Sequence, residues 1–564
     1  MKVLLAGLGL LSSLALPCRG SASAPAPLPP RPSSTGGELP EPGLPPVPFP
    51  PGNPITAEKA LLGKALFWDE QLSSSGTVAC GTCHRPEGGG ADPRSLTAAG
   101  STHPGLDLLF GGDDDVVGSR GVIRQLADGA YAPDELFGLV PRVTRRRAPS
   151  AINAAYSPTL FWDGRAGGMF FDPVTGQELL ADGAALESQA SAPPVSPVEM
   201  AHEGEDWTKV AARIEAASPL RLAHDVPSEL QGFIAGKTYP ALFALAFGTP
   251  EVTPQRIVLA LATYQRTLVS DRSRFDDFLA GDASALTAQE QTGLDVFFDA
   301  GKCHECHGGS LLTDHGFHDI GVRPDAEDLG RGAVTGLPED AGRFRTPGLR
   351  NVALRAPYFH NGRLADLGDV VKFYDEGGDF EADELIVPLN LSPSKRLALV
   401  AFLGTLTDPR VENGEPPFDR PALFSESAAF PQLLGAGTAG QGGLVPETIA
   451  VEPATVDNPA LRLGVRGALG AAPGVLAIDA ALAPAPWTLA GAEVFLAASP
   501  LLVASVVGAL DGAPDAGAGH ATLTFDLATA APPVGLELFL QWFVLDPGAP
   551  AGLASSAATR VTLF

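Results

Sequence analysis

Apolar side chains recur three or four positions apart along most of the chain up to about residue 410. This spacing places them on one face of a helix. Several of these stretches follow a Ser or Thr whose side-chain oxygen can accept the free N–H groups of a first helical turn. These capping residues are Thr56, Thr253, Thr287 and Ser392. The pattern predicts a mainly α-helical protein over this part of the chain.

The pattern changes from about residue 441 onward. No lysine occurs after Lys395, and turns rich in Gly, Pro and Ala become frequent. Residues 536–545 and 560–564 combine β-branched and aromatic side chains, which favours strands. We therefore expect residues 441–564 to form a separate β-sandwich-like module of unknown function, joined to the helical part by a linker at 411–440.

The N-terminal residues have the features of an export signal. Lys2 is followed by an apolar run over residues 3–16, which is too short to span a bilayer. We expect residues 1–24 to be a signal peptide and the protein to reach the periplasm or another extracytoplasmic space. Cys18 is a candidate for lipid modification, which would anchor the protein to a membrane as a lipoprotein, although small residues just after it offer a competing cleavage site. The Pro-rich segment 25–54 is predicted to be a linker.

Charge and cysteine content narrow the function further. The 564 residues include 38 Lys and Arg against 65 Asp and Glu, which gives a formal net charge of −27. Such an acidic chain is poorly suited to duplex DNA or an anionic membrane surface, so we expect no nucleic-acid partner. The 5 cysteines are too few for a disulfide scaffold, and most of them fall in two short, identical spacings, which indicates cofactor chemistry.

Two segments carry the spacing C-x-x-C-H. They are Cys80-Gly81-Thr82-Cys83-His84 and Cys303-His304-Glu305-Cys306-His307. Two thiols at this spacing can add to the two vinyl groups of one porphyrin, and the adjacent imidazole then becomes the proximal ligand of the iron. A redox C-x-x-C or half of a zinc site is the alternative, but each motif continues directly into a histidine. The sequence therefore predicts two covalently bound haem c groups, with His84 and His307 as iron ligands.

The methionine content constrains the sixth ligand of the second haem. The 3 methionines are Met1, Met169 and Met200, so none lies near the second motif. This excludes the Met ligand that is common in electron-transfer cytochromes. The remaining candidates in that part of the chain are His315, His318, His360, Tyr358 and Tyr374. Tyr374 lies near the end of a short helix that Asp366 would cap, and an ordinary core tyrosine is the alternative interpretation.

Several short segments resemble those of the bacterial di-haem cytochrome c peroxidases, in particular their MauG-like branch. The resemblance covers roughly residues 54–408 and leaves the C-terminal module outside. The segments that carry it are Leu62-Gly63-Lys64-Ala65-Leu66-Phe67, Arg147-Ala148-Pro149-Ser150, Phe161-Trp162-Asp163-Gly164-Arg165, Pro197-Val198-Glu199-Met200, Phe344-Arg345-Thr346-Pro347 and Ala356-Pro357-Tyr358-Phe359-His360. The resemblance implies two tandem cytochrome c-like haem domains, which we place at residues 55–250 and 251–410.

The resemblance also implies roles for residues around the first haem. This haem, held by Cys80, Cys83 and His84, is the one implied to react with peroxide. Glu199 resembles the distal acid/base, and Gln189 resembles the amide that hydrogen-bonds bound oxygen species. A carboxyl group suits that position, because splitting an O–O bond requires a proton to move from one oxygen to the other. Without the family, a solvent-facing Glu and Gln would be the simpler interpretation.

Two further residues concern the path of electrons. Trp162 resembles the tryptophan that lies between the two haems and passes electrons, with an ordinary core tryptophan as the alternative. Tyr374 aligns with the axial position of the second haem, as in the MauG-like branch, and a phenolate there would lower the iron potential. The second haem, held by Cys303, Cys306 and His307, is implied to transfer electrons to the first.

The chain departs from the family pattern in the long segment 85–143. Its one histidine, His103, is a candidate sixth ligand of the first haem in the resting state, and a surface turn is the alternative because Pro104 follows it. The run Asp113-Asp114-Asp115 is a candidate calcium site, although an exposed acidic turn would have the same composition.

The leading hypothesis is an exported peroxidase that reduces hydrogen peroxide to water with electrons from a small c-type cytochrome or cupredoxin. The electrons would pass from the C-terminal haem to the N-terminal haem. A MauG-like oxidation of a protein or small-molecule substrate is the first alternative, and Tyr374 is the reason for it. A non-catalytic di-haem electron carrier is the second. The sequence leaves open whether the protein forms a homodimer, as some members of the family do.

Overall fold

The structure is a computed structural model that describes residues 39–97 and 100–564. The predicted signal peptide, Cys18 and the first part of the Pro-rich segment lie outside the described residues. All four predicted capping residues begin helices, and each accepts a backbone N–H from three residues further on. These helices are α1 (Ala57–Phe67), α8 (Pro254–Gln265), α10 (Ala288–Phe298) and α13 (Pro393–Gly404). The predicted helical character is confirmed. Among the described residues, no helix has the length and apolar character that crossing a membrane requires.

The first helical region is built around α1 and α8. These helices cross at Gly63, where a Cβ would overlap the carbonyl oxygen of Ala260, so the close approach requires glycine. Leu62, Leu66 and Leu261 are among the side chains that fill the shared core. The smaller elements of this region are α2 (Cys80–Cys83), α3 (Arg94–Thr97), α4 (Ala185–Ala190), α5 (Trp207–Ala216), α6 (Ser228–Ile234), α7 (Tyr239–Phe247), β1 (Thr102–His103), β2 (Val116–Val117), β3 (Phe170–Phe171) and β4 (Glu178–Leu180).

The second helical region has the same kind of helix crossing at a glycine. α10 and α13 cross at Gly293, where a Cβ would overlap the carbonyl oxygen of Ala398. Phe402 packs edge-on against both Phe275 and Phe297, with ring centroids 5.3 Å apart in each pair. Its smaller elements are α9 (Arg274–Leu279), α11 (Gly332–Thr335), α12 (Leu367–Glu376), β5 (Phe317–His318) and β6 (Phe344–Arg345). In both regions, the helix that carries the glycine comes just before the C-x-x-C-H motif.

The chain crosses between these regions more often than expected from the sequence. Although we placed the boundary at residue 250, α8 follows that residue and still lies in the first core. α14 (Pro409–Asn413) begins a second return, which buries Val411, Phe418 and Leu423 from the expected linker in the same core. Helical periodicity shows that a face is apolar, but it does not show which core that face will join.

The C-terminal part consists of antiparallel sheets, which confirms its predicted β-rich character. One sheet has the order β13-β10-β15-β17-β7, with β16 paired to β15, and another has the order β14-β9-β8. Leu463, Leu476 and Trp542, from strands of both sheets, meet in a single core. The strands are β7 (Gln432–Leu434), β8 (Glu447–Ile449), β9 (Leu461–Ala468), β10 (Gly474–Asp479), β11 (Leu482–Leu489), β12 (Ala492–Leu496), β13 (Val503–Val507), β14 (Gly519–Phe525), β15 (Glu537–Leu545), β16 (Leu553–Ser555) and β17 (Ala558–Thr562).

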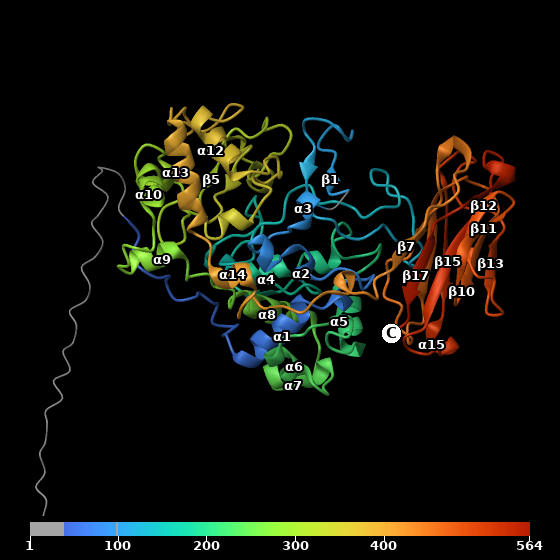
Figure 1. The fold of residues 1–564 in the computed structure, drawn as a ribbon. Helices are drawn as coiled ribbons and strands as arrows, with labels where there is room; N and C mark the ends of the chain where they lie inside the picture. The colour runs from blue at the N-terminus through green and yellow to red at the C-terminus, as the bar shows by residue number, and fades with distance from the viewer. Residues whose placement is uncertain (1–38, 98–99) are drawn as a thin grey trace, which may run out of the picture.

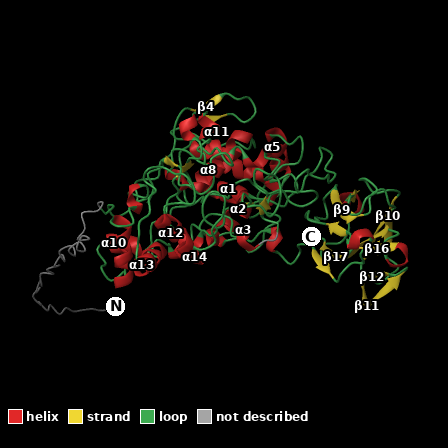
Figure 2. Cartoon of the chain, turned by 90° about the horizontal axis from the view of Figure 1, so that it is seen from above, coloured by secondary structure: helices red, strands yellow, loops and turns green. Residues whose placement is uncertain are grey.

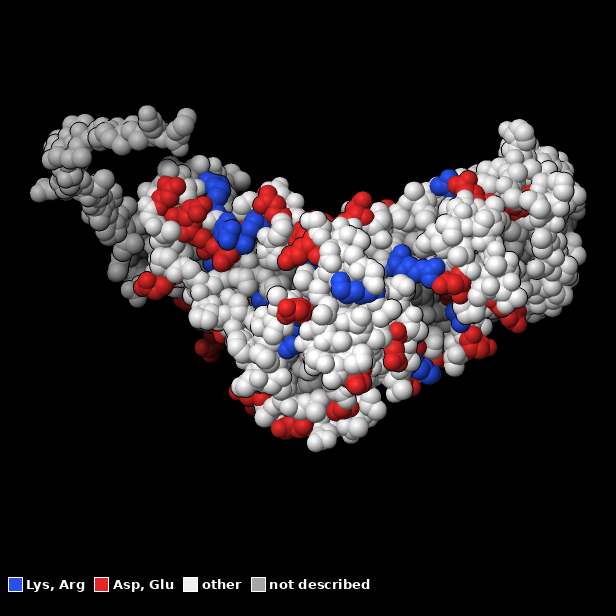
Figure 3. All heavy atoms as spheres, turned by 90° about the horizontal axis from the view of Figure 1, so that it is seen from below, with Lys and Arg blue, Asp and Glu red and all other residues white. Residues whose placement is uncertain are grey.

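The first helical region lies in the middle of the molecule. The second region, with α10, α12 and α13, lies on one side of it and the C-terminal sheets lie on the other (Figure 1). Figure 2 shows the same order from above. Charged side chains are spread over the helical part, whereas the sheet region presents few of them in the view from below (Figure 3). The first motif therefore lies in a region with neighbours on both sides.

Candidate functional site

The first C-x-x-C-H motif forms a single helical turn. Cys80 and Cys83 stand at the two ends of α2, and His84 follows directly. Nδ1 of His84 lies 3.1 Å from the carbonyl oxygen of Gly90. Because a carbonyl only accepts hydrogen bonds, Nδ1 carries the proton and Nε2 keeps its lone pair for a metal. Burial lowers the pKa of His84, which favours the neutral, ligating form of the ring.

The second motif has the same arrangement. Cys303 begins a single 3-10 turn, and Nδ1 of His307 lies 3.1 Å from the carbonyl oxygen of Leu312. Burial lowers the pKa of His307 to about 4. Burial also raises the pKa of Cys80 and Cys83, and that of Cys303, to about 12, and none of these cysteines is in a disulfide. Each motif thus offers free thiols and one neutral imidazole, as an attached haem c requires.

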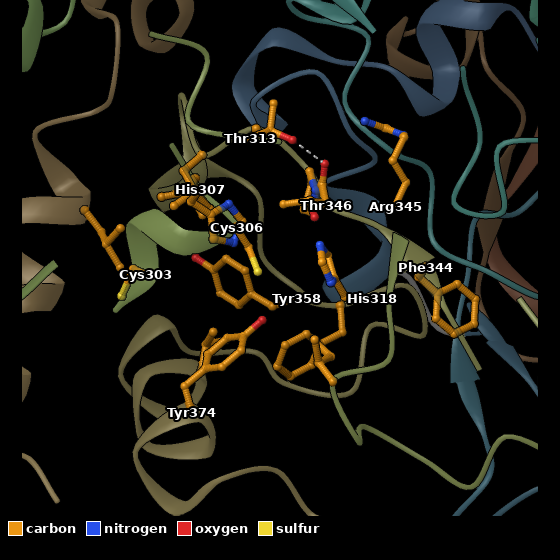
Figure 4. A pocket seen from close by; sticks show the side chains of 18 of the residues that line it. Cys303, Cys306, His307, Thr313, His318, Phe344, Arg345, Thr346, Tyr358 and Tyr374 are labelled. Carbon is orange, nitrogen blue, oxygen red and sulfur yellow. Dashed lines mark hydrogen bonds between the residues drawn. The ribbon is translucent and has the colours of Figure 1, made fainter. Parts of the chain in front are cut away.

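A cavity of about 260 Å³ lies beside the second motif. Its walls include Cys303, Cys306 and His307 together with Tyr358 and Tyr374, and Figure 4 shows these side chains around one space. All of the ligand candidates that the sequence offers for the second haem line this cavity. The structure therefore brings the second motif and its ligand candidates together.

Tyr374 is the candidate that interacts with both thiols of the motif. It lies in the last turn of α12, which Asp366 caps and which ends at Gly377 in the left-handed conformation. The helical prediction for this segment is confirmed. Burial raises the pKa of the Tyr374 phenol well above its usual range, and the nearby Cys306 and Cys303 add to this effect. A metal or a positive charge would be needed to ionise such a phenol.

The other ligand candidates differ in the contacts that their side chains already make. Nε2 of His318 lies 2.8 Å from the carboxylate of Asp314. The ring of His360 stacks on Phe344, with centroids 3.6 Å apart, and burial lowers its pKa to about 3. His315 keeps a buried Nδ1 without a hydrogen-bond partner. The cavity alone does not select one ligand among them.

Four buried arginines also line the cavity; Arg350 pairs with Asp276, and the other three test whether the cavity suits a haem. These three are Arg147, Arg345 and Arg355, with 5%, 8% and 7% of their surface exposed. Within the described part of the chain, none of them forms an ion pair with a carboxylate, and Nε of Arg147 and of Arg355 has no hydrogen-bond partner. Burial lowers the pKa of Arg147 to about 9 and that of the other two to about 10. Buried charges need counter-charges, and the propionates of a haem would supply them.

Sequence reasoning did not anticipate these arginines as a group. Arg147 and Arg345 stand in segments that carry the family resemblance, but nothing in the local sequence marks an arginine as buried and unpaired. Their donor set and the thiols on the same wall fit a bound haem c.

Glu199 lies close to the first motif. Its charge raises the pKa of Cys80 and of Cys83, so the carboxyl group is within electrostatic reach of both thiols. Burial raises the pKa of Glu199 itself, while a hydrogen bond from Ser196 and the charge of Arg165 oppose this effect. A carboxyl group in such surroundings holds its proton to a higher pH than an exposed one, which suits proton transfer.

Gln189 is half-buried on α4, and an ion pair fixes this short helix. The carboxylate of Glu187 accepts from Arg266 at 2.7 and 2.8 Å and from Asn53 at 2.7 Å. No hydrogen bond joins the side chains of Gln189 and Glu199 in the described structure. The anchoring role of Glu187 has no signal in the sequence, because its partners lie 79 and 134 positions away.

Trp162 lies on the wall of the cavity beside the second motif. Its indole N–H donates to the carbonyl oxygen of Arg147 at 2.8 Å, and its own carbonyl accepts the backbone N–H of Arg345 at 2.8 Å. A little further along the chain, Arg165 interacts electrostatically with Glu199. The turn that begins at Trp162 therefore connects the cavity beside the second motif with Arg165, which lies within electrostatic reach of Glu199.

His103 is buried, with 6% of its surface exposed, so the alternative of a surface turn is wrong. It lines a separate, smaller cavity of about 30 Å³ together with Asp114, Arg145 and His360. Its ring packs edge-on against Phe137, with centroids 5.7 Å apart. No residue of the first motif lines this cavity. The structure does not bring His103 together with His84.

The acidic run at residues 113–115 forms contacts within its own loop. The carboxylate of Asp114 accepts the backbone N–H of Leu106 at 2.6 Å and of Asp107 at 3.0 Å. In the described residues, the one group of three candidate metal ligands close together is Cys306, Asp314 and His318, whose ligand atoms lie within 4.8 Å of one another. Cys306 belongs to the second motif, so the structure lends no support to a calcium site at the acidic run.

Known proteins resemble the helical part of this chain. A family model described as di-haem cytochrome c peroxidase matches residues 57–284. The methylamine utilization protein MauG of Methylorubrum extorquens is 34% identical over 369 residues, which cover 64% of this chain and 81% of that protein. The cytochrome c peroxidase Ccp of Escherichia coli is 33% identical over 332 residues, which cover 58% of this chain and 54% of that protein.

A solved structure gives a further comparison. It is the crystal structure of a MauG-like protein associated with microbial copper homeostasis, which is 28% identical to this chain, with a TM-score of 0.47. The comparison covers 66% of this chain and 97% of that one. Sequence identity over most of the length of MauG, together with two complete haem motifs, shows that this chain is an oxidoreductase of the di-haem cytochrome c peroxidase family.

Proposed function

We propose that the protein reduces hydrogen peroxide to water at the first motif, with electrons that enter through the second. The observation that carries this proposal is the buried carboxyl group of Glu199 within electrostatic reach of Cys80 and Cys83. A group that can hold and return a proton is needed where an O–O bond is split. The reaction consumes one peroxide, two electrons and two protons and yields two waters.

The residues of the first motif have distinct tasks in this proposal. Cys80, Cys83 and His84 hold the haem, which supplies the iron where peroxide is reduced. Glu199 takes a proton from one peroxide oxygen and delivers it to the other, which leaves as water. The amide of Gln189 donates a hydrogen bond that orients the peroxide. The burial of Glu199 helps this transfer, because the raised pKa lies closer to neutral pH than that of an exposed carboxyl group.

Electrons pass from the second haem to the first in this proposal. Cys303, Cys306 and His307 would hold the second haem, and the phenol oxygen of Tyr374 would be available as a further ligand of its iron. Trp162 passes the electrons between the two sites in this proposal, and its place on the wall of the cavity beside the second motif supports that role. Two one-electron deliveries from a small c-type cytochrome or cupredoxin complete each turnover.

We further propose two cytochrome c-like haem domains in an exported protein. The repeated crossing of a glycine-bearing helix with a later helix supports two related units. The apolar run after Lys2 supports export, because a charged start followed by a short apolar stretch is typical of a secretory signal. Cys18 remains the candidate for a lipid anchor.

The proposal is tested with purified protein that carries both haems and has been pre-reduced. Replacing Glu199 with Gln removes the carboxyl proton but keeps the size of the side chain. We expect Glu199→Gln to lower the rate of peroxide consumption by about 10²- to 10⁴-fold. Glu215→Gln, at an exposed site on α5 in the same region, serves as the control and should leave the rate unchanged. A loaded protein that does not consume peroxide, or full activity in Glu199→Gln, would contradict the proposal.

A MauG-like oxidation of a protein or small-molecule substrate is the second candidate, and Tyr374 favours it. Its phenol lines the same cavity as both thiols of the second motif, and a phenolate ligand stabilises higher oxidation states of iron. In this case peroxide would be consumed without an external electron donor, and the two electrons would come from the substrate. Peroxide reduction that depends strictly on a reduced donor protein would count against it.

A further inference from the structure

We propose that the C-terminal module holds Glu199 in position through residues 120–142, which we call the bracing loop. This inference rests on the role proposed above for Glu199. The loop lies between the first helical region and the sheets (Figure 1), and it contacts the module on one side and the segment 197–203 on the other. It would give the module a task in the reaction, with Gln125, Arg142 and Glu452 as positioning residues.

The contacts between the bracing loop and the module are buried and specific. The Gln125 amide donates to the carboxylate of Glu452 at 2.7 Å, and these residues are only 2% and 4% exposed. The backbone N–H of Tyr131 donates to the hydroxyl of Thr522 at 2.9 Å. Arg466 donates to the carbonyl oxygen of Leu139 at 2.7 Å. The partners in the module belong to, or directly follow, strands of the sheet β14-β9-β8.

Apolar packing accompanies these hydrogen bonds. Ile123, Tyr131 and Leu139 of the bracing loop form one buried cluster with Ile449 of β8. The hydrogen bonds named above fix how the loop lies on the module, because leaving a buried amide or carboxylate unpaired would cost stability. The loop therefore takes its shape from the module surface.

The other side of the bracing loop holds the backbone around Glu199. The guanidinium of Arg142 donates to the carbonyl oxygen of Pro197 at 2.6 Å. Gly121 lies directly against Val198 and Glu199, where a Cβ would overlap the carbonyl oxygen of Val198 and come within 2.8 Å of Cα of Glu199. The loop thus supports the backbone of Glu199 from two sides.

The segment is also held just after Glu199. The backbone N–H of Glu203 donates to the carbonyl oxygen of Gln125 at 3.0 Å, and its carboxylate accepts from Arg124 at 2.6 and 2.9 Å. Gln125 therefore binds the module with its side chain and the Glu199 segment with its backbone. Gln125 thus connects the module directly to the segment that follows Glu199.

The proposal predicts that breaking the contact between Gln125 and Glu452 impairs the first haem but not the second. The test uses the full protein with both haems, with cyanide as the probe of the first haem and absorption spectra as the readout. Gln125→Leu removes the donor and keeps the side chain's bulk. We expect it to weaken cyanide binding about tenfold, the effect of one misplaced hydrogen-bonding group, with no change in the absorption bands of the second haem.

A double variant separates positioning from general damage. If Gln125 acts through Glu199, then Gln125→Leu should have no further effect in a protein that already carries Glu199→Gln. Arg466→Ala, at a partly exposed site, is a milder way to loosen the loop and should weaken binding in the same direction. Asp479→Asn is the matched control, because Asp479 is a fully buried carboxyl group of the same module that binds Ser499 rather than the loop. It should leave cyanide binding unchanged.

The outcomes distinguish this inference from the proposed function. Wild-type cyanide binding in both Gln125→Leu and Arg466→Ala, with weaker binding in Glu199→Gln, would overturn the bracing role and leave the proposed function standing. An equal loss from Gln125→Leu in the presence and absence of Glu199 would also overturn it. Unchanged binding and peroxide turnover in Glu199→Gln would remove the proposed function and the bracing role with it.

Discussion

The two motif regions share their framework and differ in the groups placed around it. In each region a glycine, Gly63 or Gly293, lets the helix before the motif pack directly on the backbone of a later helix. In each, the motif histidine donates its Nδ1 proton to a carbonyl oxygen 3.1 Å away. The surroundings then diverge: the first region has Glu199 near its thiols, whereas the second has phenols and, in the described part of the chain, three buried arginines that form no ion pair with a carboxylate.

This difference shows which parts of the molecule set the chemistry. The shared framework prepares a neutral imidazole beside two thiols, which suffices to hold a haem. A carboxyl group with a raised pKa can also move protons, whereas a buried phenol with a raised pKa ionises only when a metal or a positive charge lies beside it. The proposed difference in function between the two regions therefore depends on a few side chains.

The largest expected effect tests whether the two motifs hold their haems independently. Replacing Cys80 and Cys83 with Ser should remove one haem from the mass of the intact protein and leave the absorption of the other unchanged. The matching pair, Cys303→Ser with Cys306→Ser, should give the reverse result. Mass spectrometry of the exported proteins provides the measurement. Loss of both haems from either variant would show that the regions do not mature separately.

The next effect tests the shared helix crossing. Gly63→Ala and Gly293→Ala should each lower the free energy of unfolding by about 3 kcal/mol, because a Cβ has no room against the facing backbone. Denaturant titration measures this loss. Gly232→Ala and Gly404→Ala are the controls in α6 and α13, since a Cβ at either site meets no atom within 4 Å. Clearly unequal losses in the two regions would break the parallel between them.

A smaller effect separates the two regions by pH. Burial raises the pKa of Glu70 in the first region to about 8 and that of Asp319 in the second to about 6. Each folded form binds the proton more tightly than the unfolded chain, so stability falls as pH rises from the ordinary carboxyl value towards these values. We expect the stability that Glu70 contributes to be lost progressively between about pH 4.5 and pH 8. Glu70→Gln should flatten this slope in thermal unfolding, and an unchanged slope would contradict the assignment.

The smallest expected effect concerns the potential of the second haem. Tyr374→Phe removes the phenol oxygen and should raise the reduction potential of this haem by on the order of 100 mV, with a changed absorption spectrum. The first haem should keep its potential. Tyr358→Phe, on the same cavity wall, is the comparison variant. If only Tyr358→Phe changed the spectrum, the ligand assignment would move to that residue.

The chemistry-bearing motifs could be predicted because each is local in sequence. The spacing of Cys80, Cys83 and His84 fixes a haem signature within one turn, and capping residues such as Thr56 and Ser392 mark helix starts in the same way. These signals depend on neighbouring residues only, so they appear in the sequence without any knowledge of the fold.

Long-range pairing could not be predicted. Glu187 meets Arg266 across 79 positions, and Gln125 meets Glu452 across 327. Neither pair produces a periodic or compositional signal in the sequence, because the sequence does not distinguish a buried acidic residue from an exposed one. The same limit explains why α8 was expected in the second half, and why the sequence could offer several ligands for the second haem without choosing among them.

The burial of Val411, Phe418 and Leu423 in the first core has a consequence for the order in which the protein matures. A chain that is synthesised from its N-terminus delivers the first motif early, but the core around it lacks one wall until residue 423 has been made. The half that is made first is thus the last to be finished. Enzymes that attach haem to Cys80 and Cys83 would meet a first region that is not yet folded. Its core would close only when the segment with Val411, Phe418 and Leu423 packs against it.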